Sequence, residues 1–206
     1  MFSNKFKIDH FAYRTFDMNN IINCYPDCTV EKDIYNFPNN VTAKWLSNKN
    51  DPYIFVSQYN GLIHDKKIKS ETTINLDKLS NVIKGYDKPS YDMYKKLNEH
   101  NQYLAWTILF KNEINHVAFL VDDIEETLNT IKEKYPEYSL TNPNAPIQVS
   151  EDKELFQFAI KAETIDYKFS DGVKSVPFSF IEFVERKNGR RGFEGNNASK
   201  IFESTK

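Results

Sequence analysis

Residues 9–13 read DHFAY and residues 115–119 read NHVAF, so a polar residue, a histidine, an apolar residue, an alanine and an aromatic residue follow one another twice. Each copy lies in a run of aromatic and β-favoured residues long enough for one strand, at residues 6–16 and 114–121. A helix or turn and then further strands are expected after each copy. The repeat therefore predicts two related modules, each beginning with a histidine-bearing strand.

The remaining segments favour an α+β fold made of paired βαβββ modules with a helical insertion between them. Apolar spacing predicts insertion helices that begin near Asn75 and Ser90, the first of which ends at Gly85. Asp171 and Gly172 are expected to form a turn between the last two strands. The other expected elements are strands at 41–46, 53–59, 155–169 and 178–184 and a helix at 124–135.

We expect one domain over residues 1–206, because a chain of this length can bury a single core. Its expected parts are module one at about 5–60, the helical insertion at about 66–106, module two at about 112–186 and a C-terminal tail at 187–206. The sequence assigns no oligomeric state.

Charge and hydrophobicity exclude several classes of partner. The 27 basic and 29 acidic residues are mixed along the chain and give a formal net charge of −2, which disfavours nucleic acid binding. The basic cluster at 187–191 is interpreted as a solvated loop. No apolar run approaches the roughly 20 residues of a membrane helix, so we expect a soluble, cytoplasmic protein with no membrane partner. Cys24 and Cys28 are expected to be reduced thiols.

His10 and His116 are the first candidates for a metal site. A single inward histidine is usually structural, its ring nitrogens bonded to neighbouring groups. Two equivalent histidines favour metal ligation, because pairing of the modules would bring their strands together at the centre of the sheet. Ala12 and Ala118, two residues further along each strand, leave space beside the imidazoles.

Glu182 is the candidate anionic ligand, because it is a charged residue within the apolar strand FSFIEFV and a buried carboxylate needs a partner. Glu185 is the alternative, but it faces the other way and is interpreted as forming a surface pair with Arg186. Two imidazoles and one carboxylate form the facial triad typical of non-haem iron(II) enzymes. Zinc or manganese also fits these ligands.

Arg14 shares the inner face of the first strand with His10. Its guanidinium group could bind a substrate carboxylate in bidentate fashion. The alternative is a structural ion pair with Glu182 or with another acid, and we favour the substrate role.

The chain resembles the 2-oxoadipate dioxygenase/decarboxylase family of the vicinal-oxygen-chelate superfamily, whose folds include glyoxalases and dioxygenases. The resemblance is carried by DHFAYRTF at 9–16, YIFVS at 53–57, YLAW at 103–106, NHVAF at 115–119, FIEFVER at 180–186 and GFEGNNASKIFEST at 192–205. It implies that His10, His116 and Glu182 are iron ligands and that Arg14 contacts the substrate. The better-known members are far longer.

The resemblance implies an iron(II)-dependent oxidoreductase whose partners are a small 2-oxo acid and dioxygen. The products would be a 2-hydroxy acid and carbon dioxide, with 2-oxoadipate giving 2-hydroxyglutarate in lysine catabolism. Nickel, cobalt, zinc or manganese could occupy the isolated protein. Two alternatives stay open: a metal-dependent, glyoxalase-like isomerase or lyase, and a non-catalytic ligand-binding module.

Overall fold

The structure, a computed structural model, describes residues 7–37, 41–48, 53–60, 74–161 and 164–192. Most of the expected tail lies outside these residues. In chain order the elements are β1 (Lys7–Thr15), α1 (Met18–Ile22), β2 (Thr29–Phe37), β3 (Val41–Ser47), β4 (Tyr53–Tyr59), α3 (Leu76–Lys84), α4 (Tyr91–His100), α5 (Gln102–Phe110), β5 (Ile114–Leu120), α6 (Ile124–Lys134), β6 (Gln148–Val149), β7 (Leu155–Lys161), β8 (Thr164–Phe169), β9 (Gly172–Pro177) and β10 (Phe180–Arg186).

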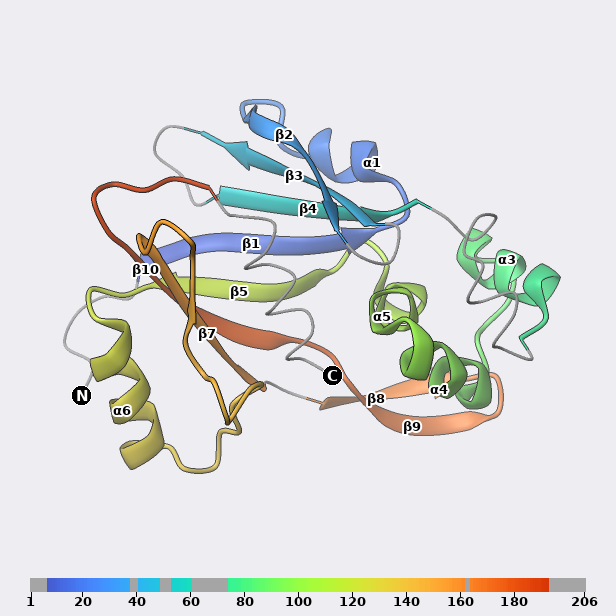
Figure 1. Cartoon of the computed structure of the whole chain (residues 1–206). Helices are drawn as coiled ribbons and strands as arrows, with labels where there is room; N and C mark the ends of the chain where they lie inside the picture. The colour runs from blue at the N-terminus through green and yellow to red at the C-terminus, as the bar shows by residue number, and fades with distance from the viewer. Residues whose placement is uncertain (1–6, 38–40, 49–52, 61–73, 162–163, 193–206) are drawn as a thin grey trace.

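Eight of the described strands form one mixed sheet in the order β2-β3-β4-β1-β5-β10-β7-β6 (Figure 1). β1 and β5 lie at its centre and pair antiparallel. β4 runs parallel to β1 on one side, and β10 runs parallel to β5 on the other. β3 and β7 then add antiparallel to β4 and β10. The two halves of the sheet therefore repeat the same pattern outward from the centre, which confirms the predicted pairing of βαβββ modules.

The helix of each module packs on the sheet through apolar residues. In the first module, α1 buries Met18 and Ile21 against a cluster that includes Leu46, Ile54 and Val56. In the second, α6 packs its buried residues against β7 and β10; the cluster contains Ile124, Leu128, Ile131, Phe158, Ile160 and Phe183. The helices begin after Asp17 and Asp123, whose carboxylates accept hydrogen bonds from first-turn amides.

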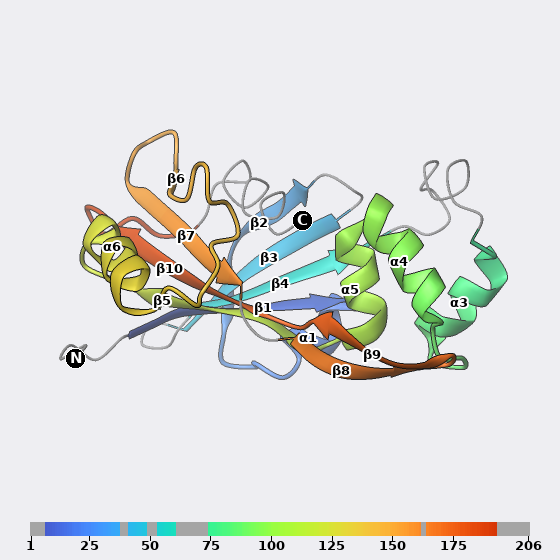
Figure 2. The ribbon, with the colours of Figure 1, turned by 90° about the horizontal axis from the view of Figure 1, so that it is seen from below.

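The helical insertion, α3 to α5, lies at one end of the sheet beside the β8–β9 hairpin (Figure 2). As predicted, α3 begins after Asn75 and ends at Gly85, which adopts the left-handed conformation with φ of 82°, and α4 begins after Ser90. Residues 103–110 of α5 are all buried, so this helix forms the core of the insertion. The hairpin packs on the insertion, with Phe169 against Tyr91 and Tyr94 of α4 and Tyr167 against Phe110 of α5.

The predicted strands differ from the observed ones in two respects. The strand expected at 155–169 consists of β7 in the main sheet and β8 in the separate hairpin, and the turn at Asp171 joins β8 to β9. β2, β9 and the two-residue β6 were not predicted. β9 buries only Val176 and β2 is an edge strand with charged residues, so neither has the apolar alternation that indicates a strand.

Candidate metal centre

His10 and His116 meet across the central pair of strands. In the β1–β5 register, His10 lies opposite Ala118 and His116 lies opposite Ala12. Each imidazole therefore faces a position occupied by a methyl group, which leaves room for the two rings to approach. Their Nε2 atoms lie 3.2 Å apart.

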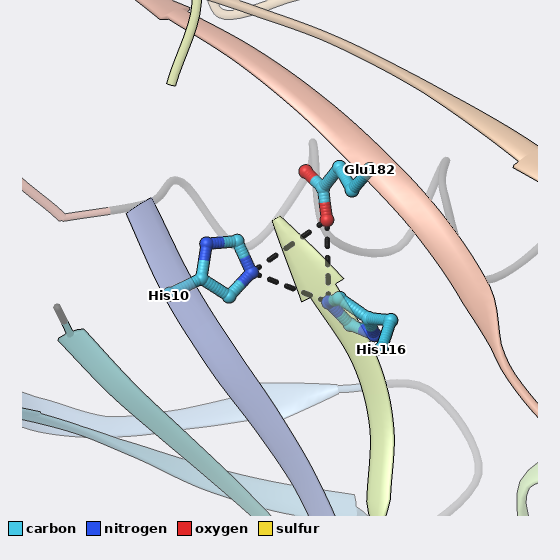
Figure 3. Close-up of side chains that lie close together, drawn as sticks. All are labelled: His10, His116 and Glu182. Atoms are coloured by element: carbon cyan, nitrogen blue, oxygen red, sulfur yellow. Dashed lines mark hydrogen bonds and ion pairs between the residues drawn. The ribbon is translucent and has the colours of Figure 1, made fainter. Parts of the chain in front are cut away.

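Glu182 reaches the two histidines from β10. This strand runs parallel to β5 with Glu182 beside Ala118. The Oε2 atom of Glu182 lies 3.2 Å from His116 Nε2 and 3.6 Å from His10 Nε2. Figure 3 shows the three side chains pointing toward one another from three neighbouring strands. The structure thus brings together all three residues that the sequence suggested as ligands, and all three are buried.

Hydrogen bonds at the far side of each group direct these three atoms inward. His10 Nδ1 lies 2.9 Å from Asp9 Oδ2, and His116 Nδ1 lies 3.1 Å from Asn115 Oδ1. Because both partners offer acceptor oxygens, these contacts favour a proton on each Nδ1, the tautomer in which Nε2 is free to bind a metal. Gln157 Nε2 donates to Oε1 of Glu182 and leaves Oε2 for the cluster.

The donor set fits a divalent cation. Two Nε2 lone pairs and a carboxylate oxygen face one another, an electron-rich arrangement that a bound cation would stabilise. Ligand atoms about 2.1 Å from a metal and 90–110° apart lie roughly 3.0 to 3.4 Å from one another, close to the separations found here. His10, His116 and Glu182 together form a group that could hold a metal ion.

Burial affects the charge of His116. It lowers the pKa of His116 to about 4, although hydrogen bonding to Glu182 acts in the opposite direction. The ring is therefore neutral near pH 7, which is the form that binds a metal. Phe180 stacks on this ring with centroids 4.2 Å apart, and Trp45 lies against His10 at 5.3 Å. These contacts restrict the rotation of both imidazoles.

Phe55 occupies the position in the first module that matches Glu182 in the second. Ala12 pairs with Phe55 across β1 and β4, just as Ala118 pairs with Glu182 across β5 and β10. Phe55 is buried in a cluster with Ala12 and Trp45. One module therefore offers a histidine and a carboxylate, and the other offers a histidine alone. Three protein ligands would leave coordination positions open on a six-coordinate metal.

Arg14 is buried on the inner face of β1, beyond His10 and Ala12. The guanidinium carbon lies 5.0 Å from the ring centre of Tyr103 and 5.4 Å from that of Trp106, both on α5. Burial lowers the pKa of Arg14 to about 10, so the group stays charged at neutral pH. The two rings therefore hold the positively charged guanidinium group of Arg14 on the face of the sheet that carries the candidate ligands.

The expected surface pair of Glu185 and Arg186 is not formed, and that prediction was wrong. Glu185 Oε2 accepts a hydrogen bond from the Ile124 amide at the start of α6. Arg186 binds Asp9 in the interior, with Nε and Nη2 lying 2.7 and 2.9 Å from the two carboxylate oxygens. Residues 182, 184 and 186 share one face of β10, so strand alternation already pointed Arg186 inward.

Comparison with known proteins places the chain in a family. The family profile described as 2-oxoadipate dioxygenase/decarboxylase matches residues 71–189, more than half of the chain. The chain belongs to this family. His116 and Glu182 lie inside the matched residues, whereas His10 and Arg14 precede them. The predicted resemblance to the 2-oxoadipate dioxygenase/decarboxylase family is confirmed.

Individual relatives agree with the family assignment. The chain is 34% identical over 142 residues to the chloroplastic 2-oxoadipate dioxygenase/decarboxylase of Arabidopsis thaliana, covering 58% of this chain and 38% of the relative's length. Hydroxyglutarate synthase from Oryza sativa, solved in complex with 2-oxoadipate, superposes with a TM-score of 0.76 and 25% identity, covering 97% of this chain and 81% of that one.

A more distant structure shows how widely the fold is shared. A glyoxalase superfamily protein from Ralstonia eutropha superposes with a TM-score of 0.67 at 16% identity, covering 91% of this chain and 74% of that one. The predicted vicinal-oxygen-chelate fold is therefore confirmed for this member of the 2-oxoadipate dioxygenase/decarboxylase family.

The predicted cytoplasmic location is contradicted by the same family members. The Arabidopsis relative is named chloroplastic, and a rice relative is named chloroplastic/amyloplastic. The prediction rested on charge and hydrophobicity, which do not distinguish one aqueous compartment from another. Among the residues that the structure describes, no helix is long and apolar enough to cross a membrane.

Asp9, Asn115, Gln157 and Arg186 contact the candidate ligands or their partners but were not predicted as site residues. Two of them carried a signal in the repeat, because each histidine is preceded by a polar residue that can accept a hydrogen bond. Gln157 interrupts the apolar strand LFQFAIK much as Glu182 interrupts its own. The same signal that identified Glu182, a polar residue on the inner face of an apolar strand, could therefore have identified Gln157.

Proposed function

We propose that His10, His116 and Glu182 bind iron(II), and that the protein converts a 2-oxo acid resembling 2-oxoadipate, together with dioxygen, into the shortened 2-hydroxy acid and carbon dioxide. One observation carries the proposal: two buried imidazoles and a buried carboxylate converge inside a member of the 2-oxoadipate dioxygenase/decarboxylase family. The atoms of the reaction balance without an outside reductant, since 2-oxoadipate and dioxygen contain the atoms of 2-hydroxyglutarate and carbon dioxide.

Bound iron(II) would supply open coordination positions at which a chelating 2-oxo acid and dioxygen can react. The chain's own residues then have separate tasks. His10, His116 and Glu182 hold the cation, and their orientation depends on Asp9, Asn115 and Gln157 at their far sides. This second set of contacts fixes which atom of each ligand faces inward.

Arg14 is proposed to bind the distal carboxylate of the substrate. It lies on the same strand face as His10, four residues along β1, and two alternate residues of a strand are separated by roughly 7 Å. Four residues therefore correspond to roughly 13 Å of strand, which a long arginine and an extended dicarboxylic acid can bridge. Tyr103 and Trp106 would hold the guanidinium in place while it fixes the position of the reacting carbons.

An oxygen-electrode assay tests this function. Protein purified without oxygen and loaded with iron(II) is expected to consume oxygen and release carbon dioxide in equal amounts when given 2-oxoadipate. A panel of 2-oxo acids of different chain length identifies the preferred substrate. The Glu182→Gln variant should be inactive, whereas Glu185→Gln, on the same strand but bonded to α6, should retain activity.

Other outcomes would identify the alternatives. Metal-dependent turnover under argon, with nickel, cobalt or zinc and no oxygen uptake, would contradict the oxygenase and favour an isomerase or lyase. Equal metal contents in the wild type and His116→Ala after equilibrium dialysis would contradict the metal site itself and favour a binding module.

A further inference from the structure

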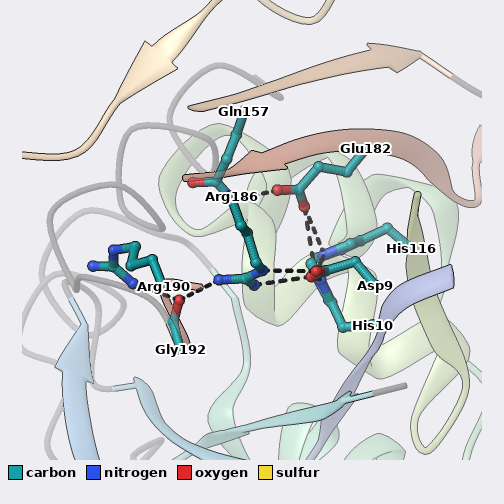
Figure 4. Close-up of polar contacts among 8 residues, drawn as sticks. All are labelled: Asp9, His10, His116, Gln157, Glu182, Arg186, Arg190 and Gly192. Atoms are coloured by element: carbon teal, nitrogen blue, oxygen red, sulfur yellow. Dashed lines mark hydrogen bonds and ion pairs between the residues drawn. The ribbon is translucent and has the colours of Figure 1, made fainter. Parts of the chain in front are cut away.

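Asp9 lies between a candidate ligand and a buried arginine. Its carboxylate accepts a hydrogen bond from His10 Nδ1 at 2.9 Å and two from Arg186, at 2.7 Å to Nε and 2.9 Å to Nη2 (Figure 4). The side chains of Asp9 and Arg186 are 3% and 8% exposed. Arg186, Asp9 and His10 therefore form a continuous, buried chain of charged hydrogen bonds that ends at the candidate metal centre.

The matching position in the second module is neutral. Asn115 precedes His116 as Asp9 precedes His10, and its amide oxygen accepts from His116 Nδ1 at 3.1 Å. The duplicated fold thus places the two histidines in equivalent positions but supports them with different chemistry. A charged carboxylate backs one imidazole, and an uncharged amide backs the other.

Stability alone does not account for the Asp9–Arg186 pair. Removing two charges from water costs about as much as their attraction returns, so a buried ion pair is often no more stable than an apolar substitute. The pair does have a geometric consequence. A planar guanidinium bound to both carboxylate oxygens fixes the plane of the carboxylate, and the carboxylate in turn fixes the ring of His10.

We propose that Asp9 and Arg186 are positioning residues that hold His10 as the Nδ1-protonated tautomer and make it the more strongly held imidazole donor of the metal centre. A carboxylate partner increases the electron density of an imidazole more than an amide does, so His10 is the stronger donor and His116 the weaker. This inference rests on the proposed metal site. It adds Asp9 and Arg186, which lie 177 positions apart in the sequence, to the residues that determine metal affinity.

Arg186 also bonds to the segment that follows β10. Its Nη1 donates to the Gly192 carbonyl at 2.8 Å, and Arg190 Nη1 donates to the same oxygen at 2.7 Å. Arg190 also forms an ion pair with Asp152, away from Asp9. It therefore offers a matched control, because changing Arg190 disturbs the Gly192 contact without touching Asp9 or His10.

Cobalt(II) titration of the full chain against a chromophoric chelator measures the effect on metal affinity. We expect Asp9→Ala to weaken cobalt binding about 10- to 100-fold, the range usual for residues that orient a metal ligand. Asn115→Ala should weaken it less. Arg186→Lys should also weaken binding, because an ammonium group cannot bind both carboxylate oxygens. Arg190→Lys should stay within about twofold of the wild type. Equal affinities for wild type and Asp9→Ala would overturn the proposal.

A paired change guards against misfolding. The Asp9→Asn/Arg186→Gln variant removes both charges, so neither is left buried without a partner. Circular dichroism should show a folded protein, while cobalt binding should remain about 10-fold weaker than in the wild type. Full cobalt affinity in this variant would show that the charged pair has no positioning role.

Nitrogen-15 NMR of the histidine rings separates this inference from the proposed function. In metal-free wild type, His10 should give the signature of the Nδ1-protonated tautomer, and Asp9→Ala should give a mixture of tautomers. If the wild type binds no cobalt but shows this change, the proposed metal site fails and the positioning role stands. If cobalt binds but the His10 signal is the same in both proteins, the positioning role fails.

Discussion

The Nε2 atoms of His10 and His116 lie 3.2 Å apart although 106 residues separate them in the sequence. Each imidazole projects from a central strand of the duplicated sheet, across from an alanine of the other. The candidate metal centre therefore lies where the two modules join. A cation bound there would link the modules, so metal binding should change the thermal stability of the protein as well as its activity.

Metal addition should raise the thermal midpoint of the wild-type protein. At a free metal concentration 100-fold above the dissociation constant, binding to the folded state adds about 2.7 kcal/mol to the free energy of unfolding. His10→Ala and His116→Ala should lose most of this increase because each removes a ligand. Differential scanning fluorimetry with cobalt(II) or with a chelator measures the difference. Glu185→Gln is the control, and an unchanged increase in both histidine variants would contradict the site.

Arg14→Met should reduce kcat/KM for a dicarboxylic 2-oxo acid by about 10- to 100-fold, as expected for a lost hydrogen bond between charged groups. A 2-oxo acid of equal length that lacks the distal carboxylate should react equally with both proteins. Metal affinity should not change. Steady-state kinetics with the two substrates form a double-mutant cycle, and equal losses with both would show that Arg14 has a structural role instead.

Phe55→Glu should add a fourth protein ligand, because Phe55 occupies the position that matches Glu182 in the repeated register. We expect tighter cobalt(II) binding and slower oxygen consumption, since the new carboxylate would fill a coordination position needed by the substrate or dioxygen. Phe55→Leu keeps the site apolar and serves as the control. If Phe55→Glu and Phe55→Leu have the same cobalt affinity and the same oxygen uptake, position 55 does not correspond to the ligand position of Glu182.

The metal-free protein should lose stability as the pH falls from about 6.5 toward 4. Burial lowers the pKa of folded His116 to about 4 from an ordinary value of 6.5. Within that interval the unfolded chain binds a proton that the folded chain excludes, so acid favours unfolding. Above the interval neither state binds this proton, and the contribution of His116 to the free energy of unfolding is complete. Urea unfolding in the presence of a chelator, repeated across this pH range, measures how the free energy of unfolding changes with pH. His116→Asn should flatten this pH dependence.

Local sequence signals were sufficient to predict much of the architecture and three of the residues in the cluster. The repeated histidine strands indicated the modules, and Asn75, Gly85 and Ser90 marked helix ends because capping chemistry depends on neighbouring residues. Glu182 was recognisable because a carboxylate within an apolar strand needs a buried partner.

Contacts between distant segments were beyond such signals. Strand alternation placed Arg186 on the inner face with Glu182, but its partner Asp9 lies near the opposite end of the chain, and no local signal joins the two residues. β9 was missed because it buries only Val176 and is held in place by pairing with β8 and by packing on distant segments, more than by an apolar pattern of its own.

The pairing of β1 with β5 also determines when the candidate metal centre can form during folding. β1 can meet β5 only after the chain has closed a loop of about 100 residues, and contacts of such long range form slowly. Glu182 must then add from β10, still further along the chain. Neither module alone contains both histidines, so a complete set of ligands is absent until the two modules have docked. Capture of the metal is thus expected to be a late event, which would make metal uptake a kinetic reporter of the final assembly of the sheet.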